Sequence, residues 1–349
     1  MLKVLSPTDL ADPRRVDPSA EGWAKRIRSY ARADDARALM ELAITAIPFA
    51  GFWVLAAVLL PYGYGYSLLA CFGAALCLTR LFVIQHDCGH RSFFQNRLAN
   101  DLVGGLIGIL TFTPYRMWRR NHSVHHATSG NLDRRRDSDI RTLTLAEYAA
   151  LSPLRRLGYR LYRHPFTIFV LGPIWVFQLK YRLPIDIRRA TRDDWISVLR
   201  TNAAILALIF GIGAFIGPLN VFLIHAPIIQ ITAMIGIWLF YVQHQFEQTT
   251  WDEAETWNLQ EAALFGSSHY DLPKPLAWLT GSIGVHHVHH LNSKIPFYRL
   301  SEVLGDHPAL ARISRVGFTE AFSTTRLHIW DDANRRLISF AEAHRNLRG

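Results

Sequence analysis

The sequence predicts an all-α integral membrane protein, with four transmembrane helices arranged as two hairpins and a helical cap on the cytosolic side. The first reason is that residues 42–79 and 201–246 contain no Lys, Arg, Asp or Glu. One crossing of a bilayer takes roughly 20 apolar residues, so each block is long enough for about two. The second reason is that each block has a turn motif near its middle, PYGYGY at 61–66 and GPLN at 217–220.

The elements follow in chain order. A polar lead-in at 1–41, with a helix over about 21–40, precedes a membrane domain at 42–304 and a cytosolic tail at 305–349. The transmembrane helices are expected at about 42–60, 67–90, 196–216 and 221–244, with a cytosolic insertion at 91–195 between the pairs. Two apolar pieces of this insertion, 102–113 and 166–179, are too short to cross comfortably, and we expect them to lie in the membrane interface or dip into it.

The distribution of charge predicts the orientation. The chain has a net charge of +10, yet both turn motifs lack Lys and Arg. Because basic residues concentrate on the cytoplasmic side, both termini and the insertion are expected there. The positive charge also favours contact with anionic lipid headgroups. A nucleic-acid partner is not expected, because no basic face with interleaved aromatic residues is present.

Histidine clusters are the strongest chemical signal. Nine of the 16 histidines fall in three short motifs: HDCGH (His86, His90), HSVHH (His122, His125, His126) and HHVHH (His286, His287, His289, His290). In a helix, residues three or four apart project from one side and can share a metal ion. The predicted topology brings all three motifs to the same face of the membrane. His287 breaks the spacing of its neighbours and is expected to point away.

The number of imidazoles indicates two metal ions. Eight are too many for one ion but suit two ions with about four each. Imidazole binds Zn, Cu, Fe and Ni. A two-iron site that activates O2 matches the number of ligands and the apolar setting, and structural zinc is the alternative. The cap is therefore expected to carry a histidine-rich dimetal site.

Several other residues are candidates near this site. His244, at the end of the fourth helix, is a candidate ninth ligand, the alternative being an interfacial polar residue. Four polar residues flank ligand positions and are candidates to hold the second ring nitrogen of a ligating histidine; their alternative role is as ordinary solvated or capping groups. They are Asp87, Asn121, Glu247 and Asn292. Three tryptophans near the clusters, Trp118, Trp238 and Trp257, are candidates to shape a substrate tunnel or to anchor the chain in the interface.

At these clusters the sequence resembles the membrane fatty acid desaturases, which have one H-x3-4-H box and two H-x-x-H-H boxes in this order. The surrounding segments HSVHHATSGNLDRR, YVQHQF and GSIGVHHVHHLNSKIPFYRL look like the acyl-lipid omega-6 (delta-12) branch of bacteria and plastids. The likeness extends from about Phe52 to Leu304. It implies a di-iron enzyme in a membrane, here the bacterial inner membrane, that uses O2 and two electrons to remove two hydrogens from a lipid acyl chain.

The resemblance also implies the ligands and the partners. The box histidines of the family correspond to the eight named above without His287, and a further family ligand corresponds to His244. The chain has no HPGG motif of a fused cytochrome b5 domain, so a separate electron carrier such as ferredoxin is expected. A di-iron hydroxylase or ketolase acting on lipids or carotenoids is the closest alternative function. A histidine-lined metal transporter is a more distant one, since apart from His225 the spans offer few polar ligands.

Overall fold

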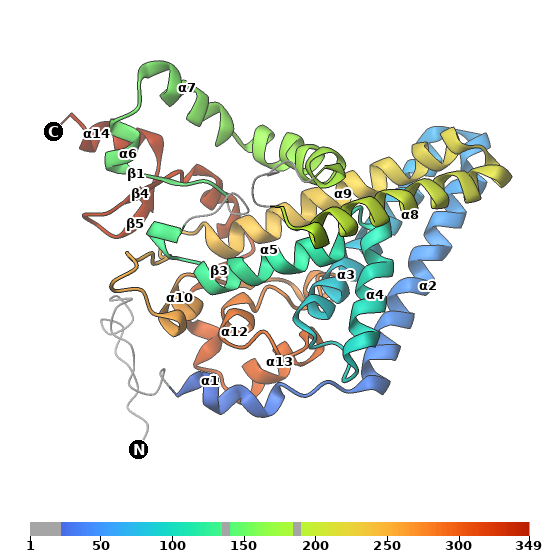
Figure 1. The fold of residues 1–349 in the computed structure, drawn as a ribbon. Helices are drawn as coiled ribbons and strands as arrows, with labels where there is room; N and C mark the ends of the chain where they lie inside the picture. The colour runs from blue at the N-terminus through green and yellow to red at the C-terminus, as the bar shows by residue number, and fades with distance from the viewer. Residues whose placement is uncertain (1–21, 135–139, 184–189, 349) are drawn as a thin grey trace.

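The computed structural model describes residues 22–134, 140–183 and 190–348, which form a mostly helical protein (Figure 1). The helices are α1 (Trp23–Arg26), α2 (Asp35–Leu59), α3 (Tyr64–His90), α4 (Arg97–Leu110), α5 (Tyr115–Thr128), α6 (Leu145–Ala149), α7 (Pro153–Tyr162), α8 (Arg192–Ile216), α9 (Pro218–His244), α10 (Leu259–Phe265), α11 (Lys274–Leu279), α12 (His286–Leu291), α13 (Phe297–Asp306) and α14 (Phe340–Asn346). The strands are β1 (Leu143–Thr144), β2 (His269–Asp271), β3 (Arg315–Gly317), β4 (Ile329–Asp331) and β5 (Arg336–Ile338).

Shorter helical turns connect these elements. The 3-10 turns are η1 (Ile27–Tyr30), η2 (Leu60–Tyr62), η3 (Leu132–Arg134), η6 (Lys180–Arg182), η7 (Leu310–Arg312) and η8 (Glu320–Arg326). Two π-helical segments, η4 (Thr167–Leu171) and η5 (Ile174–Leu179), follow α7.

Within the described ranges, four helical segments are long and apolar enough to cross a membrane: 35–62, 64–90, 192–216 and 218–244. All four begin earlier than the sequence predicted, and polar residues ahead of the apolar blocks cap two of them, α2 and α8. Thr191 and Asp194 form a capping box that starts α8. The most buried of the four is α3, and it carries His86 and His90 in its last two turns.

The connections within each pair of spans lie at the predicted turn motifs. Gly63, with φ of 143°, separates α2 from α3, and Gly217, with φ of 89°, separates α8 from α9. Positive φ is strained for residues with a side chain, which explains glycine at both turns. Helix α2 packs against α3, α8 packs against α9, and α3 also packs against α9. A buried ion pair of 2.5 Å between Arg80 and Glu41 joins α3 to α2.

The prediction of one helix over 21–40 is wrong. The chain forms α1 and η1, leaves helical geometry at 31–34, and begins α2 at Asp35. Asp34 is extended and its carboxylate accepts the Arg37 N–H at 3.0 Å, which starts a new helix. The Asp34 N–H also donates to the Tyr298 hydroxyl at 2.9 Å, so tertiary contacts hold the break. Residues 1–21 of the predicted lead-in lie outside the described residues.

The two short apolar pieces of the insertion differ in structure. The first forms α4, which packs against α3 and leaves Leu98, Leu102 and Leu106 exposed. The second forms η4 and η5, with Phe166, Leu171, Trp175 and Leu179 exposed. Their location in a membrane interface stays a prediction.

Two small sheets make the fold mostly helical rather than all-α. Strand β4 pairs parallel with β1 and antiparallel with β5, while β2 pairs parallel with β3. Strands of two or three residues are too short to produce a recognisable alternating pattern. The β4–β5 turn is stabilised by Asp331, whose carboxylate accepts the N–H groups of Ala333 and Asn334.

Candidate metal centre

Nine histidines from four helices converge at the end of α3. Helix α3 supplies His86 and His90, α5 supplies three, α12 supplies three, and α9 supplies His244 as its last residue. They form two groups, each with ligand atoms within 4.8 Å of one another and each able to hold a metal ion. The first group is His86, His90, His122, His126 and His289, and the second is His125, His244, His286 and His290.

Helical spacing distributes each H-x-x-H-H motif between the two groups. In α5, His122 and His126 are four residues apart and share the first group, while His125 belongs to the second. Helix α12 has the opposite arrangement: His286 and His290 share the second group, and His289 belongs to the first. Residues at i and i+4 lie on one helix face, whereas adjacent residues are about 100° apart. Each motif therefore contributes to both groups.

In the first group, ring nitrogens face one another at short distances. The Nε2 atom of His122 lies 3.0 Å from Nε2 of His90 and 3.1 Å from Nε2 of His126. The His126 and His289 Nε2 atoms are 3.2 Å apart. The ring of His86 packs against His122 and His289, with centroids 4.6 and 4.5 Å apart.

The second group is built around His244. Its Nε2 atom lies 3.1 Å from Nε2 of His125 and 3.1 Å from Nε2 of His286. The ring of His290 packs against both His244 and His286. It also stacks on His126 of the first group, with centroids 4.1 Å apart, so the two groups are adjacent.

The electrostatics of both groups favour neutral imidazoles. Burial first, and then the neighbouring histidines, lower the pKa of five rings well below the ordinary value: His122, His126, His286, His289 and His290. A neutral ring offers a lone pair, and a protonated ring cannot bind a metal. These five rings are thus already in the protonation state that binds a metal ion.

The geometry fits coordination of an ion. Imidazole nitrogens bind such metals at about 2.0–2.1 Å, so two ligands subtending roughly 90–109° at one ion are about 2.8–3.4 Å apart. The Nε2 separations of 3.0 to 3.2 Å lie in this range. The purely nitrogen donor set is compatible with iron and also with zinc, copper and nickel.

Asp87 lies where a supporting residue is expected. One of its carboxylate oxygens is 3.2 Å from Nδ1 of His86, and the other accepts the Phe297 N–H at 2.6 Å. A metal-ligating histidine is usually oriented by such a partner on its second nitrogen. Nδ1 of His244 lies 3.4 Å from the carbonyl oxygen of Gly266, a neighbour that the sequence did not indicate.

The other polar candidates contact different groups. Glu247 forms a 3.1 Å ion pair with Arg336, and the side chain of Asn292 accepts the Lys294 N–H at 3.1 Å. Asn121 lies on α5, and in the ranges that the structure describes it makes no hydrogen bond to a histidine ring. His287 points away from both groups, with Nε2 2.9 Å from the Leu310 carbonyl oxygen.

Aromatic rings border both groups, and the sequence indicated one of the two. Trp118 stacks on His122 at 4.7 Å, one helical turn before it on α5. Phe240 packs against both His125 and His244 at 5.1 Å, one turn before His244 on α9. An aromatic residue four positions before a candidate ligand was the available signal for Phe240.

The other two candidate tryptophans contact no histidine of either group in the described structure. Trp238 packs against Phe169 and Phe322, with centroids 5.3 and 5.1 Å away. The indole N–H of Trp257 donates to the Ser129 carbonyl at 3.0 Å.

Comparisons with known proteins agree with this site. Residues 65–320 match the family model described as fatty acid desaturase. The chain is 42% identical over 316 residues to a fatty acid desaturase of Bacillus subtilis (strain 168), covering 90% of this chain and 89% of that protein. It is 31% identical over 242 residues to a chloroplastic omega-6 fatty acid desaturase of Glycine max, covering 64% of this chain and 52% of the relative.

An sn-1 oleoyl-lipid 12-desaturase of Anabaena variabilis is 29% identical over 269 residues, covering 72% of this chain and 70% of that protein. The resemblance found at the histidine boxes is therefore confirmed over most of the sequence. With its membrane-length helices and two histidine groups, this chain belongs to the fatty acid desaturase family, a family of oxidoreductases.

Proposed function

We propose that this protein uses O2 and two electrons to introduce a cis double bond into an acyl chain of a membrane phospholipid, with omega-6 (delta-12) selectivity. The convergence of nine histidines into two adjacent groups carries the proposal. The selectivity is supported by the names of two relatives, an omega-6 fatty acid desaturase and an sn-1 oleoyl-lipid 12-desaturase.

The proposed topology has two helical hairpins, α2–α3 and α8–α9, that cross the membrane. Both hairpin turns lack Lys and Arg, so the opposite end of the spans, with the histidine groups, is the cytoplasmic one. In a bacterial cell this is the inner membrane with both termini in the cytoplasm. The short cap helices α10, α12 and α13 would then cover the cytoplasmic end of the spans.

The proposed ligands are the nine histidines, which would hold two iron ions. When bound, the iron supplies the O2-dependent oxidation that an unactivated methylene requires. The chain's own task is to hold the ligand rings in place and exclude water. Asp87 orients the ring of His86, and the Gly266 carbonyl lies beside Nδ1 of His244. Trp118 and Phe240 are proposed to form the wall beside which the acyl chain passes.

Lipid analysis tests the proposed reaction. The protein is expressed in cells that contain only saturated and monounsaturated lipids, and fatty acid methyl esters are analysed by mass spectrometry. A new cis double bond at the omega-6 position is expected. Hydroxylated or oxo products without a new double bond would instead identify a hydroxylase or ketolase.

A pair of substitutions tests the ligand assignment. His125→Ala removes a ring from the second group, so loss of activity and of bound iron is expected. The matched control is His344→Ala, an exposed histidine in α14, which should change neither. Iron is measured by elemental analysis of the purified proteins. Equal iron content in the two variants would contradict the assignment of His125.

A further inference from the structure

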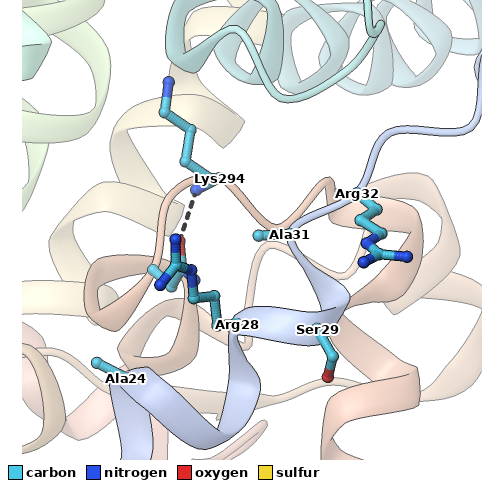
Figure 2. A pocket seen from close by; sticks show the side chains of 7 residues that line it. Ala24, Arg28, Ser29, Ala31, Arg32 and Lys294 are labelled. Carbon is cyan, nitrogen blue, oxygen red and sulfur yellow. Dashed lines mark hydrogen bonds between the residues drawn. The ribbon is translucent and has the colours of Figure 1, made fainter.

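A basic pocket lies beside the metal centre, between the N-terminal segment and the loop that follows α12 (Figure 2). The cavity has a volume of about 620 Å³. Arg28 and Arg32 line it from η1 and the break before α2, and Asn292 and Lys294 line it from the opposite side.

The charged residues that line the pocket are all positive. Three of its seven lining residues are cations and none is acidic. Across residues 22–134, 140–183 and 190–348, no carboxylate pairs with Arg28, Arg32 or Lys294. Arg97, exposed at the start of α4, lies close enough to Lys294 to add its charge. Such a concentration of one sign attracts and orients an acidic partner.

The N-terminal wall of the pocket is fixed by tertiary contacts. Ile27 is fully buried in the core, and Trp23 packs edge-on against His307 at 5.4 Å. The Tyr30 hydroxyl donates to the Asp306 carboxylate at 2.5 Å, at the end of α13. Arg28 and Arg32 are therefore presented from a rigid surface rather than from a loose arm.

The opposite wall connects the pocket directly to the first histidine group. The Lys294 ammonium donates to the main-chain carbonyl oxygen of His90 at 2.5 Å. His90 belongs to the first group, and Lys294 follows His289 of the same group by five residues. Lys294 of this cationic surface is thus in direct contact with the main chain of a proposed metal ligand, His90.

We propose that this pocket is the docking surface of an acidic one-electron carrier protein, which reduces the metal centre through the His90 side of the first group. This inference rests on the proposed function. Removing two hydrogens from an acyl chain with O2 yields one C=C bond and two waters. O2 takes up four electrons, of which the substrate supplies two, so two carrier molecules must each supply one, together with two protons from solvent.

The position of the pocket favours a soluble protein over a lipid headgroup. Figure 1 shows α1 beside α13 and beyond the start of α2, at the end of the molecule opposite the α8–α9 connection. In the proposed topology this end faces the cytoplasm rather than the bilayer. The lining residues that carry charge all lie outside the four membrane-length segments.

Charge reversal tests the docking surface. The double variant Arg28→Glu, Arg32→Glu is prepared in full-length protein in lipid nanodiscs, and its affinity for an acidic [2Fe–2S] ferredoxin is measured at low and high ionic strength. The control with the same change in charge is Arg345→Glu, Arg348→Glu, at two exposed sites near the C-terminal end. At low salt we expect the double variant to bind ferredoxin on the order of tenfold more weakly or worse, since rim charges act through long-range attraction. The difference in affinity from the control should become smaller at high salt, because salt screens this attraction.

Turnover with two electron sources distinguishes the remaining outcomes. The double variant should lose rate with reduced ferredoxin but retain it when a small chemical reductant, dithionite plus a mediator, reduces the protein anaerobically before O2 is added. Ferredoxin affinity equal to that of the control would overturn the proposal. So would an effect confined to binding of phosphatidylglycerol vesicles, which would identify a lipid contact, or an equal loss of rate with both reductants. No desaturation by the unmodified protein with either reductant would refute the proposed function, while the binding comparison would still decide the docking surface.

Discussion

Asp87→Asn tests how the metal centre is supported. The Asp87 carboxylate is fully buried and bridges Nδ1 of His86 and the N–H of Phe297. Asparagine has nearly the same shape, but it loses the charge and has only one acceptor oxygen. Either the His86 ring or the Phe297 N–H is then left facing an NH2 group. We expect the metal affinity of the first group to fall while the second group is unaffected.

Two independent arguments give the size of this effect. Loss of a partner on the second nitrogen of a ligating histidine typically costs about 10–100-fold in metal affinity. A hydrogen bond to a charged group contributes about 1.5–3 kcal/mol, and each factor of ten corresponds to about 1.4 kcal/mol. Both arguments give a loss of one to two orders of magnitude, limited to one of the two sites.

The assay is an anaerobic Fe²⁺ titration of the metal-free protein, with bound iron measured by elemental analysis. The control is Glu247→Gln, the same acid-to-amide change at an exposed residue that pairs with Arg336 and, in the described ranges, forms no hydrogen bond to a histidine of either group. Asp87→Asn should keep one tight site and weaken the other, and Glu247→Gln should keep both. Two tight sites in Asp87→Asn, or equal weakening in both variants, would refute the reasoning.

Two further substitutions test the packing around the site and the C-terminal region. A Cβ at Gly284 would lie 2.4 Å from the Tyr270 carbonyl oxygen, which cannot rotate away. Gly284→Ala should therefore cost about 1–3 kcal/mol of stability, whereas Gly236→Ala, which meets no atom within 4 Å, should not lower the melting temperature. Burial, and then Arg163, lower the pKa of His328 from its ordinary value to about 3. Below about pH 6.5 the His328 ring binds a proton in the unfolded chain but not in the folded protein, so the free energy of unfolding decreases as the pH decreases. At about pH 5 the decrease is at most about 2 kcal/mol, and it is smaller where solvent reaches the ring. Between about pH 7.5 and 5, the melting temperature of His328→Phe should fall less than that of the unmodified protein. An equal fall would contradict the role given to His328.

The sequence was sufficient to predict the four membrane-length helices and the histidines that form the two groups. Charge-free blocks and glycine turns are local features, so they locate the spans without tertiary information. Helices α2 and α8 begin earlier than predicted, at the cap residues Asp34 and Thr191. These polar residues lie outside the apolar pattern from which the helix starts were predicted. The H-x-x-H-H spacing also predicts that each motif is divided between the two groups. It combines a pair of histidines at i and i+4 with a third histidine on a different face of the helix.

The surroundings of the site were harder to predict, because they depend on long-range contacts. Glu247 and Asn292 lie near ligands in the sequence, but each has a closer partner in Arg336 or in the Lys294 N–H. The groups that do lie beside ligand nitrogens include the Gly266 carbonyl, a main-chain atom that has no sequence signature. The small sheets were missed for a similar reason, since two-residue and three-residue strands exist only through their partners.

The first histidine group is completed by a segment far along the chain from α3. His289 belongs to this group. Lys294 donates to the carbonyl of His90, 204 residues earlier in the chain, and the Phe297 N–H donates to Asp87, 210 residues earlier. Closing such a long loop costs entropy, which these hydrogen bonds offset and which a bound metal ion would offset further. A ligand that binds only the assembled state stabilises that state. Metal binding and docking of the segment from α12 to α13 therefore reinforce each other. The same segment forms one wall of the basic pocket, so the proposed carrier surface would be complete only when the metal centre beneath it is assembled.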